Sequence, residues 1–234
     1  MRAAPFQSYA TLADLLAGVE AVVSVCPPHA AVDQARAVRA LGFGGIYVDA
    51  NAVAPSTAAQ VGEMIGEKFV DGGIIGPPAH KPGTTRLYVS GPHAQTVAGW
   101  FVGGALGVVP LAGELTAASA LKMSYAAYTK GSSALLLAVN ALAESAGVRD
   151  VLIDEWDLSQ PGLSQRSGHT ASATSRKAWR FFGEMQEIAK TFEEAGLPDN
   201  FHVGAAEIYQ RMAGLKDLPP AQLEIVLQHI LKNG

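Results

Sequence analysis

The strongest constraint on the fold is a change of pattern near residue 112. Before it, short apolar segments alternate with helical ones. Strands are predicted within 20–28, 45–49, 68–76, 85–91 and 108–113, and helices within 11–18, 30–42, 56–67 and 97–107. Thr11 is the expected N-cap of the first helix, and Ser56 or Thr57 that of the helix within 56–67. Strands that alternate with helices predict a mainly parallel sheet. We expect an antiparallel strand or two near its end.

After Glu114 the sequence contains only helical patterns. A long helix is predicted over 115–146, followed by one that ends near Pro161 and a Ser/Thr-rich connection over 163–177. Three amphipathic segments follow, at 178–196, 202–214 and 219–234, the last with Pro219 or Pro220 in its first turn. We therefore predict an α/β domain over 1–112 and an all-α domain over 113–234. The second domain is so rich in apolar residues that we expect it to form a homodimer.

Composition excludes several classes of protein. The chain has 234 residues, a formal net charge of −4 and a single cysteine, so it has neither an internal disulfide nor the basic excess typical of nucleic-acid binding. Residues 87–113 lack Asp, Glu, Lys and Arg, but they contain several glycines and prolines. We interpret them as a buried core segment, and the N-terminus has no secretory h-region. A cytoplasmic location without membrane or nucleic-acid partners is expected.

The α/β half suggests nucleotide binding, yet a phosphate-binding motif is missing from these 234 residues. A dinucleotide site needs G-x-G-x-x-G between a strand and a helix. The segment "GFGGIY" (42–47) precedes its strand and has Tyr47 at the third glycine position, and "GGIIGPP" (72–78) has no helix after it. The motif G-x-x-x-x-G-K-[ST] does not occur either.

Lys122 is the main candidate for chemistry. It lies in the first turns of the long helix, which is apolar nearly all the way round, and burying an unpaired ammonium is expensive. A desolvated lysine can exchange a proton with a substrate oxygen or nitrogen. It can also extend to the surface or pair with a carboxylate. For Lys130, two turns later, we expect a carboxylate partner or solvent.

Five segments in the same order resemble the β-hydroxyacid dehydrogenase family, which includes 6-phosphogluconate and 3-hydroxyisobutyrate dehydrogenases. The likeness is greatest to a branch of phosphogluconate-dehydrogenase-like NAD(P)-dependent oxidoreductases with its own C-terminal helical domain. The segments are "VVSVCPP", "YVDANAVAP", "FVDGGIIGPPAHKPGT", "ASALKMSYAAYTKG", and the pair "EWDLSQPG" and "KAWRFFGEMQEIAKTF". The resemblance implies a partial Rossmann-like sheet followed by an all-α substrate and dimerisation domain.

The resemblance also implies roles for individual residues. Lys122 matches the catalytic lysine, a general acid/base beside a hydride transfer. Gly76, Pro77 and Tyr125 fall in or near substrate segments. Residues in the segments that lie near NAD or NADP are Cys26, Pro27, Pro28, Asn51 and Glu184.

Each of these residues also has a plainer interpretation. Tyr125 can be an aromatic core residue, Asn51 can make a local turn bond, and Gly76–Pro77 can form a tight turn. Cys26 can be a strand-end residue beneath a loop. His169, in the predicted polar connection, can belong to a charged lid or to a solvated loop, and the spacing of the histidines predicts no metal site.

Three departures from the family limit what carries over. The opening β-α-β unit with G-x-G-x-x-G is absent, so the sequence starts where a relative would be about 60 residues along. Ala126 stands where the family has Asn, and Ile75 where it has Ser. We expect these 234 residues to bind NAD(P) weakly, and neither NAD nor NADP is favoured.

Two functions remain open at this point. One is an NAD(P)-dependent oxidoreductase acting on a small polar hydroxy, keto or imine substrate. The other is a truncated, non-catalytic remnant that keeps the helical dimerisation half. Translating the reading frame upstream of Met1 would separate them, because a strand followed by G-x-G-x-x-G favours the enzyme and an immediate stop codon favours the remnant.

Overall fold

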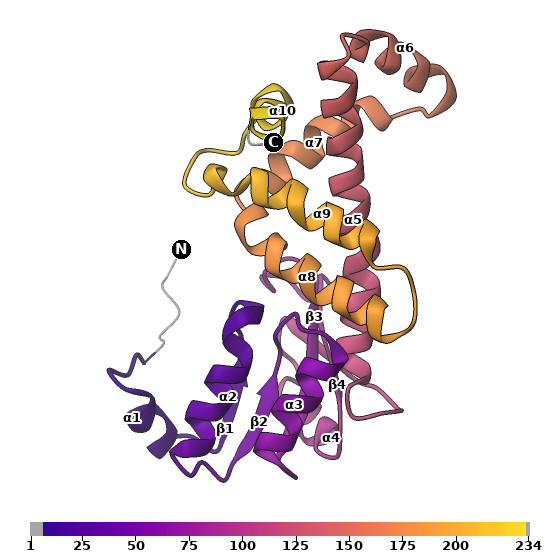
Figure 1. The fold of residues 1–234 in the computed structure, drawn as a ribbon. Coiled ribbons are helices and arrows are strands. Elements are labelled where there is room, and N and C mark those ends of the chain that lie inside the picture. Colours follow the sequence, from indigo (N-terminus) through magenta and orange to yellow (C-terminus); the bar gives the residue numbers. More distant parts are fainter. Residues whose placement is uncertain (1–6, 233–234) are drawn as a thin grey trace. The chain divides into compact units, whose positions relative to one another are not determined.

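The computed structural model describes residues 7–232, and the chain divides into two compact units, Met1–Lys122 and Met123–Gly234 (Figure 1). The division falls inside the long helix α5 (Ala117–Ser145), whose first turns belong to the first unit. The N-terminal segment 1–6 and the last two residues of the predicted helix 219–234 lie outside the described range.

The first unit contains a five-stranded sheet in the order β1-β2-β3-β4-β5. Strands β1, β2 and β3 run parallel, β4 pairs antiparallel with β3, and β5 runs parallel to β4. The strands are β1 (Ala21–Ser24), β2 (Ile46–Asp49), β3 (Phe69–Ile75), β4 (Thr85–Ser90) and β5 (Leu106–Pro110). The predicted sheet, with an antiparallel pairing towards its end, is confirmed.

Helices of this unit create two hydrophobic cores on the sheet. They are α1 (Leu12–Ala17), the 3₁₀ turn η1 (Pro28–Ala30), α2 (Ala31–Ala40), α3 (Pro55–Ile65) and α4 (Ala94–Trp100). Tyr47 packs in one core with side chains of α1, α2 and α3, whereas Val48 packs in the other with side chains of α4. This alternation along β2 is the two-residue period of a strand with both faces covered.

The first residues of α1 and α3 differ in how they are capped. Thr11 caps α1 by accepting a hydrogen bond from the Asp14 amide, as its sequence predicts. The prediction that Ser56 or Thr57 caps α3 is wrong, because the N-cap is Ala54 and Pro55 is the first helical residue. Proline suits that position, since its fixed φ matches the helix and its missing N–H would have no partner there.

Within the described residues every strand precedes α5, and the rest is helical. The second unit continues α5 and adds α6 (Arg149–Ser159), α7 (Leu163–Ser175), α8 (Ala178–Glu194), α9 (Asn200–Arg211), the 3₁₀ turn η2 (Ala213–Leu215) and α10 (Leu223–Lys232). Pro219 and Pro220 therefore precede the last helix and are not in its first turn. The predicted combination of an α/β part and an all-α part is confirmed.

The predicted polar connection over 163–177 is wrong, because most of it forms helix α7. Ser167, Thr170 and Thr174 recur at helical spacing and are buried. The hydroxyls of Ser167 and Thr174 donate to carbonyls one turn back, at 3.0 and 2.7 Å. A hydroxyl that bonds to a carbonyl of its own helix can be buried, and the polar sequence does not show this. His169 lies on this helix and is exposed.

The first turns of α5 lie very close to strand β3. A Cβ atom placed on Gly73 would come within 2.8 Å of the Ala118 carbonyl oxygen and 2.9 Å of the Lys122 Cβ. Such contacts are too short for any side chain, so glycine at this position lets the helix approach the strand.

We predict that Gly73→Ala destabilises the protein by about 1–3 kcal/mol, because the helix must shift to admit the methyl group. Gly204→Ala is the matched control: Gly204 lies within α9, and a Cβ there would have no neighbour within 4 Å. That variant should be stabilised by about 0.5–1 kcal/mol, the usual gain within a helix. Urea unfolding measures both, and equal stability of the Gly73→Ala variant and the wild type would contradict the close approach.

Candidate functional site

The N-terminus of α5 is held by side chains from two neighbouring strands. Asp71 on β3 and Ser90 on β4 are register partners. The Asp71 carboxylate accepts hydrogen bonds from the Ser119 amide at 2.7 Å and from the Ser119 hydroxyl at 2.5 Å. The Ser90 hydroxyl accepts from the Ala118 amide at 3.0 Å. Together they satisfy N–H groups that the first turn of a helix leaves unpaired.

A second buried carboxylate lies beside the first. Asp49 on β2 is the register partner of Asp71, and the two residues are 1% and 0% exposed. Burial raises the pKa of Asp49 to about 6. Burial also raises the pKa of Asp71, although its bonds to Ser119 and Ser90 oppose the rise. The Asn51 amide donates to Asp49 Oδ1 at 2.9 Å, while the buried Asp49 Oδ2 has no hydrogen-bond partner.

Lys122 follows the capped turn by three residues. Its side chain is partly buried, and its ammonium donates a hydrogen bond to the Ile74 carbonyl at 2.7 Å. Strand β3 therefore binds α5 twice, through Asp71 at the start of the helix and through Ile74 one turn later. This arrangement places a cationic proton donor beside the carboxyl end of β3.

The same strand leads into the predicted substrate segment. Gly76 has φ +127°, and a Cβ on it would come within 2.4 Å of the Thr84 carbonyl oxygen. Only glycine fits there. The Thr85 hydroxyl donates to the Pro77 carbonyl. Gly76 and Pro77 thus form an exposed bend just beyond the carbonyl that binds Lys122. Contact with a substrate remains a prediction.

The ends of β1 and β2 are joined by Asn51. Its side-chain oxygen accepts from the Cys26 amide at 2.6 Å, and its side-chain nitrogen donates to the Ser24 hydroxyl at 3.1 Å. Asn51 is 2% exposed. These side-chain bonds span strands, and the local bond of Asn51 is made by its backbone amide, to Asp49. Asn51 shapes the loop, and its contact with a cofactor remains a prediction.

A nicotinamide dinucleotide would have to bind along the carboxyl ends of β1, β2 and β3, where parallel sheets bind their ligands. Pro27 and Pro28 lead from β1 into η1 and α2, and no side chain caps the start of α2. The Ala30 and Ala31 amides donate to the Pro27 and Pro28 carbonyls, so these N–H groups are already paired and do not by themselves form a phosphate site. Burial raises the pKa of the Cys26 thiol, so this loop does not favour a thiolate.

The remaining predicted residues belong to the second unit. Glu184 on α8 pairs with Lys130 on α5 at 2.8 Å, which confirms the carboxylate partner expected for Lys130. The Lys130 ammonium also lies 4.9 Å from the centroid of the Phe181 ring. Tyr125 is 47% exposed, so its interpretation as a core residue is wrong. Binding of a cofactor by Glu184 and of a substrate by Tyr125 remain predictions.

Sequence reasoning missed three residues of the capping network, Asp71, Ser90 and Ser119, and the neighbouring carboxylate Asp49. A signal was available in two of the predicted strands, "IYVD" and "KFVD", because each ends its apolar run with aspartate. Two such strands side by side in a parallel sheet bring their carboxylates together. The serines carried no comparable signal, since serine is common in turns and at helix ends.

Two properties of the described part of the chain bear on the type of site. Within residues 7–232, three or more His, Cys, Asp or Glu side chains nowhere gather in a way that could hold a metal ion. None of the helices in that range has the length and hydrophobicity that a membrane crossing requires.

Comparisons with known proteins agree with this architecture. Residues 143–212 match a family described as "Domain of unknown function (DUF1932)". An uncharacterised 28.5 kDa protein of Methanothermus fervidus is 33% identical over 147 residues, which cover 62% of this chain and 57% of that protein. The chain therefore spans little more than half of this curated relative.

Solved structures resemble almost the whole chain. A conserved hypothetical protein from Sinorhizobium meliloti 1021 has a TM-score of 0.69 at 25% identity, over 95% of this chain and 78% of that one. A 3-hydroxyisobutyrate dehydrogenase from Salmonella typhimurium has a TM-score of 0.62 at 17% identity, over 94% and 82%. By its fold, the chain is a two-part α/β and all-α protein. Its fold is similar to that of this dehydrogenase.

We predict that Asp49→Asn removes a pH-dependent cost of folding. The pKa of Asp49 is raised from 3.8 to about 6, so the folded state binds more protons than the unfolded state between these values. This group therefore makes the wild type less stable as the pH rises from about 4 to 6, by about 1–3 kcal/mol. The stability difference between variant and wild type, measured by urea unfolding from pH 4 to 8, should grow in favour of the variant over that window. A constant difference would contradict the raised pKa.

Proposed function

We propose that the protein is an NAD(P)-dependent oxidoreductase of the β-hydroxyacid dehydrogenase type, acting on a small polar hydroxy, keto or imine substrate. The observation that carries this proposal is the position of Lys122. Its ammonium sits at the carboxyl end of β3, and the capped first turn of α5 together with the Ile74 carbonyl fixes its place. A proton donor held in this way can serve as a general acid/base.

In this reaction the bound cofactor supplies or accepts a hydride, and the protein handles the proton. Lys122 would donate a proton to the substrate oxygen or nitrogen during reduction and remove it during oxidation. The exposed backbone at Gly76 and Pro77 would contact a polar group of the substrate, and Tyr125 would add a hydroxyl. The loop at Cys26–Pro28 and Asn51 would line the cofactor side.

We predict that Lys122→Ala lowers the turnover rate by about 10²–10⁴-fold, the usual loss when a general acid/base is removed. NADPH binding should change little, because Lys122 is assigned to the proton transfer. The measurement is NADPH oxidation over a panel of small ketones, keto acids and imines. It uses the protein as encoded, including any residues upstream of Met1 in the same reading frame.

Lys68→Ala provides the matched control, because Lys68 is exposed just before β3. It should leave the rate unchanged. Unchanged turnover in the Lys122→Ala variant, with a loss of several kcal/mol in stability, would assign Lys122 a structural role and overturn the proposal. Absence of turnover and of NADPH binding in the wild type would favour the non-catalytic alternative.

We also propose that the protein forms a homodimer through its helical unit. Tyr128, Leu135 and Leu142 on α5 are spaced by seven residues and are 70%, 50% and 67% exposed. Seven-residue spacing aligns side chains along one stripe of a helix, as in helices that pack against another helix. An exposed apolar stripe of this kind is typical of a surface covered by a partner.

We expect a dimeric mass by light scattering at micromolar concentration. Leu135→Glu and Leu142→Glu together should shift it towards the monomer, because two carboxylates would enter the apolar contact. A monomeric wild type over the same concentration range would contradict the dimer.

A further inference from the structure

Helix α6 has eleven residues, and none of them is buried. Leu152, Ile153 and Trp156 are half-buried on one side, whereas Val151 and Leu158 are 70% and 82% exposed. Short helices are marginal in water and depend on packing of an apolar face. The exposed side of α6 is therefore a surface that lacks a cover within one copy of the chain.

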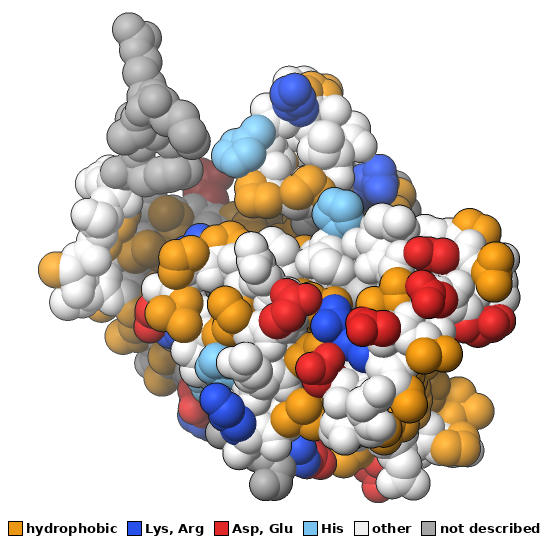
Figure 2. Space-filling model, turned by 90° about the horizontal axis from the view of Figure 1, so that it is seen from above, with side chains coloured by type: hydrophobic (Ala, Val, Ile, Leu, Met, Phe, Trp, Pro, Cys, Tyr) orange, Lys and Arg blue, Asp and Glu red, His pale blue; other side chains and the backbone are white. Residues whose placement is uncertain are grey.

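This exposed side has a defined chemical character. Asp150, Asp154 and Asp157 are spaced by four and three residues, so they lie on one stripe of the helix, and Glu155 flanks Val151 and Leu158. Figure 2 shows acidic and hydrophobic side chains gathered at the right of the view, where Figure 1 draws α6. We call this surface the acidic face, consisting of Asp150, Val151, Asp154, Glu155, Asp157 and Leu158.

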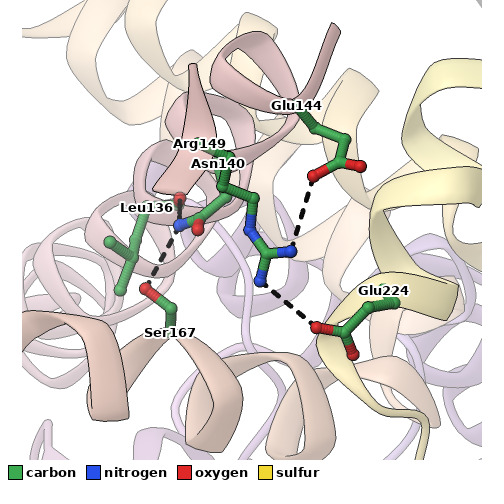
Figure 3. Close-up of polar contacts among 6 residues, drawn as sticks. All are labelled: Leu136, Asn140, Glu144, Arg149, Ser167 and Glu224. Carbon is green, nitrogen blue, oxygen red and sulfur yellow. Dashed lines mark hydrogen bonds and ion pairs between the residues drawn. The ribbon is translucent and has the colours of Figure 1, made fainter. Parts of the chain in front are cut away.

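The single basic residue of α6 does not neutralise the acidic face. The Arg149 guanidinium binds Glu144 at 3.4 Å and Glu224 on α10 at 3.2 Å, as Figure 3 shows. Two carboxylates outside the acidic face thus occupy this cation. The acidic face keeps four carboxylates around its two exposed apolar side chains.

The opposite pattern occurs elsewhere in the same unit, where α7 ends and α8 begins. A groove of about 600 Å³ is lined there by four basic residues and one acidic residue, Asp217, around a floor that includes Trp179 and Pro220. Trp179 in the floor is 37% exposed, and the Lys216 ammonium lies 4.2 Å from its ring centroid. We call this the basic groove; its main residues are Arg176, Lys177, Trp179, Arg180, Lys216 and Pro220.

The cations of the basic groove have no carboxylate partners in the described part of the chain. Lys130, Arg149, Lys190 and Arg211 of this unit form ion pairs, but the four basic residues of the groove do not. Four clustered cations against one carboxylate give the groove a positive potential, which attracts an anionic partner.

We propose that the acidic face of α6 docks into the basic groove of a second copy, and that the same contact forms in the reverse direction. Each surface supplies what the other lacks: carboxylates meet cations, and Val151 and Leu158 meet the floor around Trp179. A two-fold dimer makes such a contact twice, because its interface is self-complementary. The inference rests on the homodimer proposed above and adds a second pair of surfaces to the α5 stripe.

Charge reversal on each surface tests the pairing. The first variant carries Asp154→Lys and Glu155→Lys, and the second carries Arg176→Glu and Arg180→Glu. Each alone brings like charges together in both contacts. We expect the dimer dissociation constant to rise at least ~10-fold in each variant, as rim charges set specificity and like charges repel. Sedimentation at 0.05 and 0.5 M NaCl measures this constant.

Mixing the two variants is the decisive experiment. In the mixed dimer both contacts again join opposite charges, so a heterodimer should form with nearly the wild-type dissociation constant. The control Glu63→Lys with Glu67→Lys changes two exposed acidic residues of the first unit and should leave dimerisation unchanged. Circular dichroism establishes that every variant folds.

The outcomes separate the two ideas. A monomeric wild type would refute the homodimer itself. A dimer that is insensitive to both reversals, or variants that fail to associate when mixed, would refute the pairing of the acidic face with the basic groove and leave the homodimer intact. If only the second variant lost the dimer, the groove would contact a different acidic surface of the second copy. That result would also overturn the proposal.

Discussion

The hydrogen bonds that join Asp71 and Ser90 to the start of α5 fix the geometry of the candidate site. A helix start carries unpaired N–H groups and a partial positive charge, and a carboxylate satisfies both at once. Here the carboxylate comes from β3 and the hydroxyl from β4, so the sheet itself determines where the helix begins. Gly73 allows the helix to lie against the strand, and Lys122 then reaches the Ile74 carbonyl.

This arrangement has an electrostatic cost. Asp49 and Asp71 are buried side by side, and burial raises the pKa of both. Asp71 accepts from the Ser119 amide and hydroxyl at the helix start and from the Ser90 hydroxyl on β4. Asp49 has only the Asn51 amide on one of its oxygens. The two carboxylates therefore differ in role: Asp71 anchors the helix, and Asp49 opposes folding above its pKa. Perturbed carboxylates of this kind often occur near functional sites.

Much of the fold could be predicted from the sequence, because its periodic patterns agree with local start and stop signals. The five strands, the long helix and Thr11 as a cap follow from such local information. The α7 helix could not be predicted in this way. Its buried hydroxyls donate to carbonyls of the same helix, and a sequence rich in Ser and Thr does not reveal such bonds. Lys122 could be singled out because a charge on an apolar helix is conspicuous. The partners that place it lie 48 residues away on β3, and single-sequence patterns do not reveal such pairings.

The pairing of β3 with β4 has a consequence for how the protein folds. Asp71 and Ser90 face each other only in one register of this antiparallel pair. A slip by one residue would turn Ser90 to the opposite side of the sheet and separate the two groups that receive the helix. Docking of α5 therefore stabilises the β3–β4 pair only when the two strands are in this register. The contact between β3 and β4 closes a shorter loop than the contact between β3 and α5. The two strands can therefore pair before the long helix docks on them.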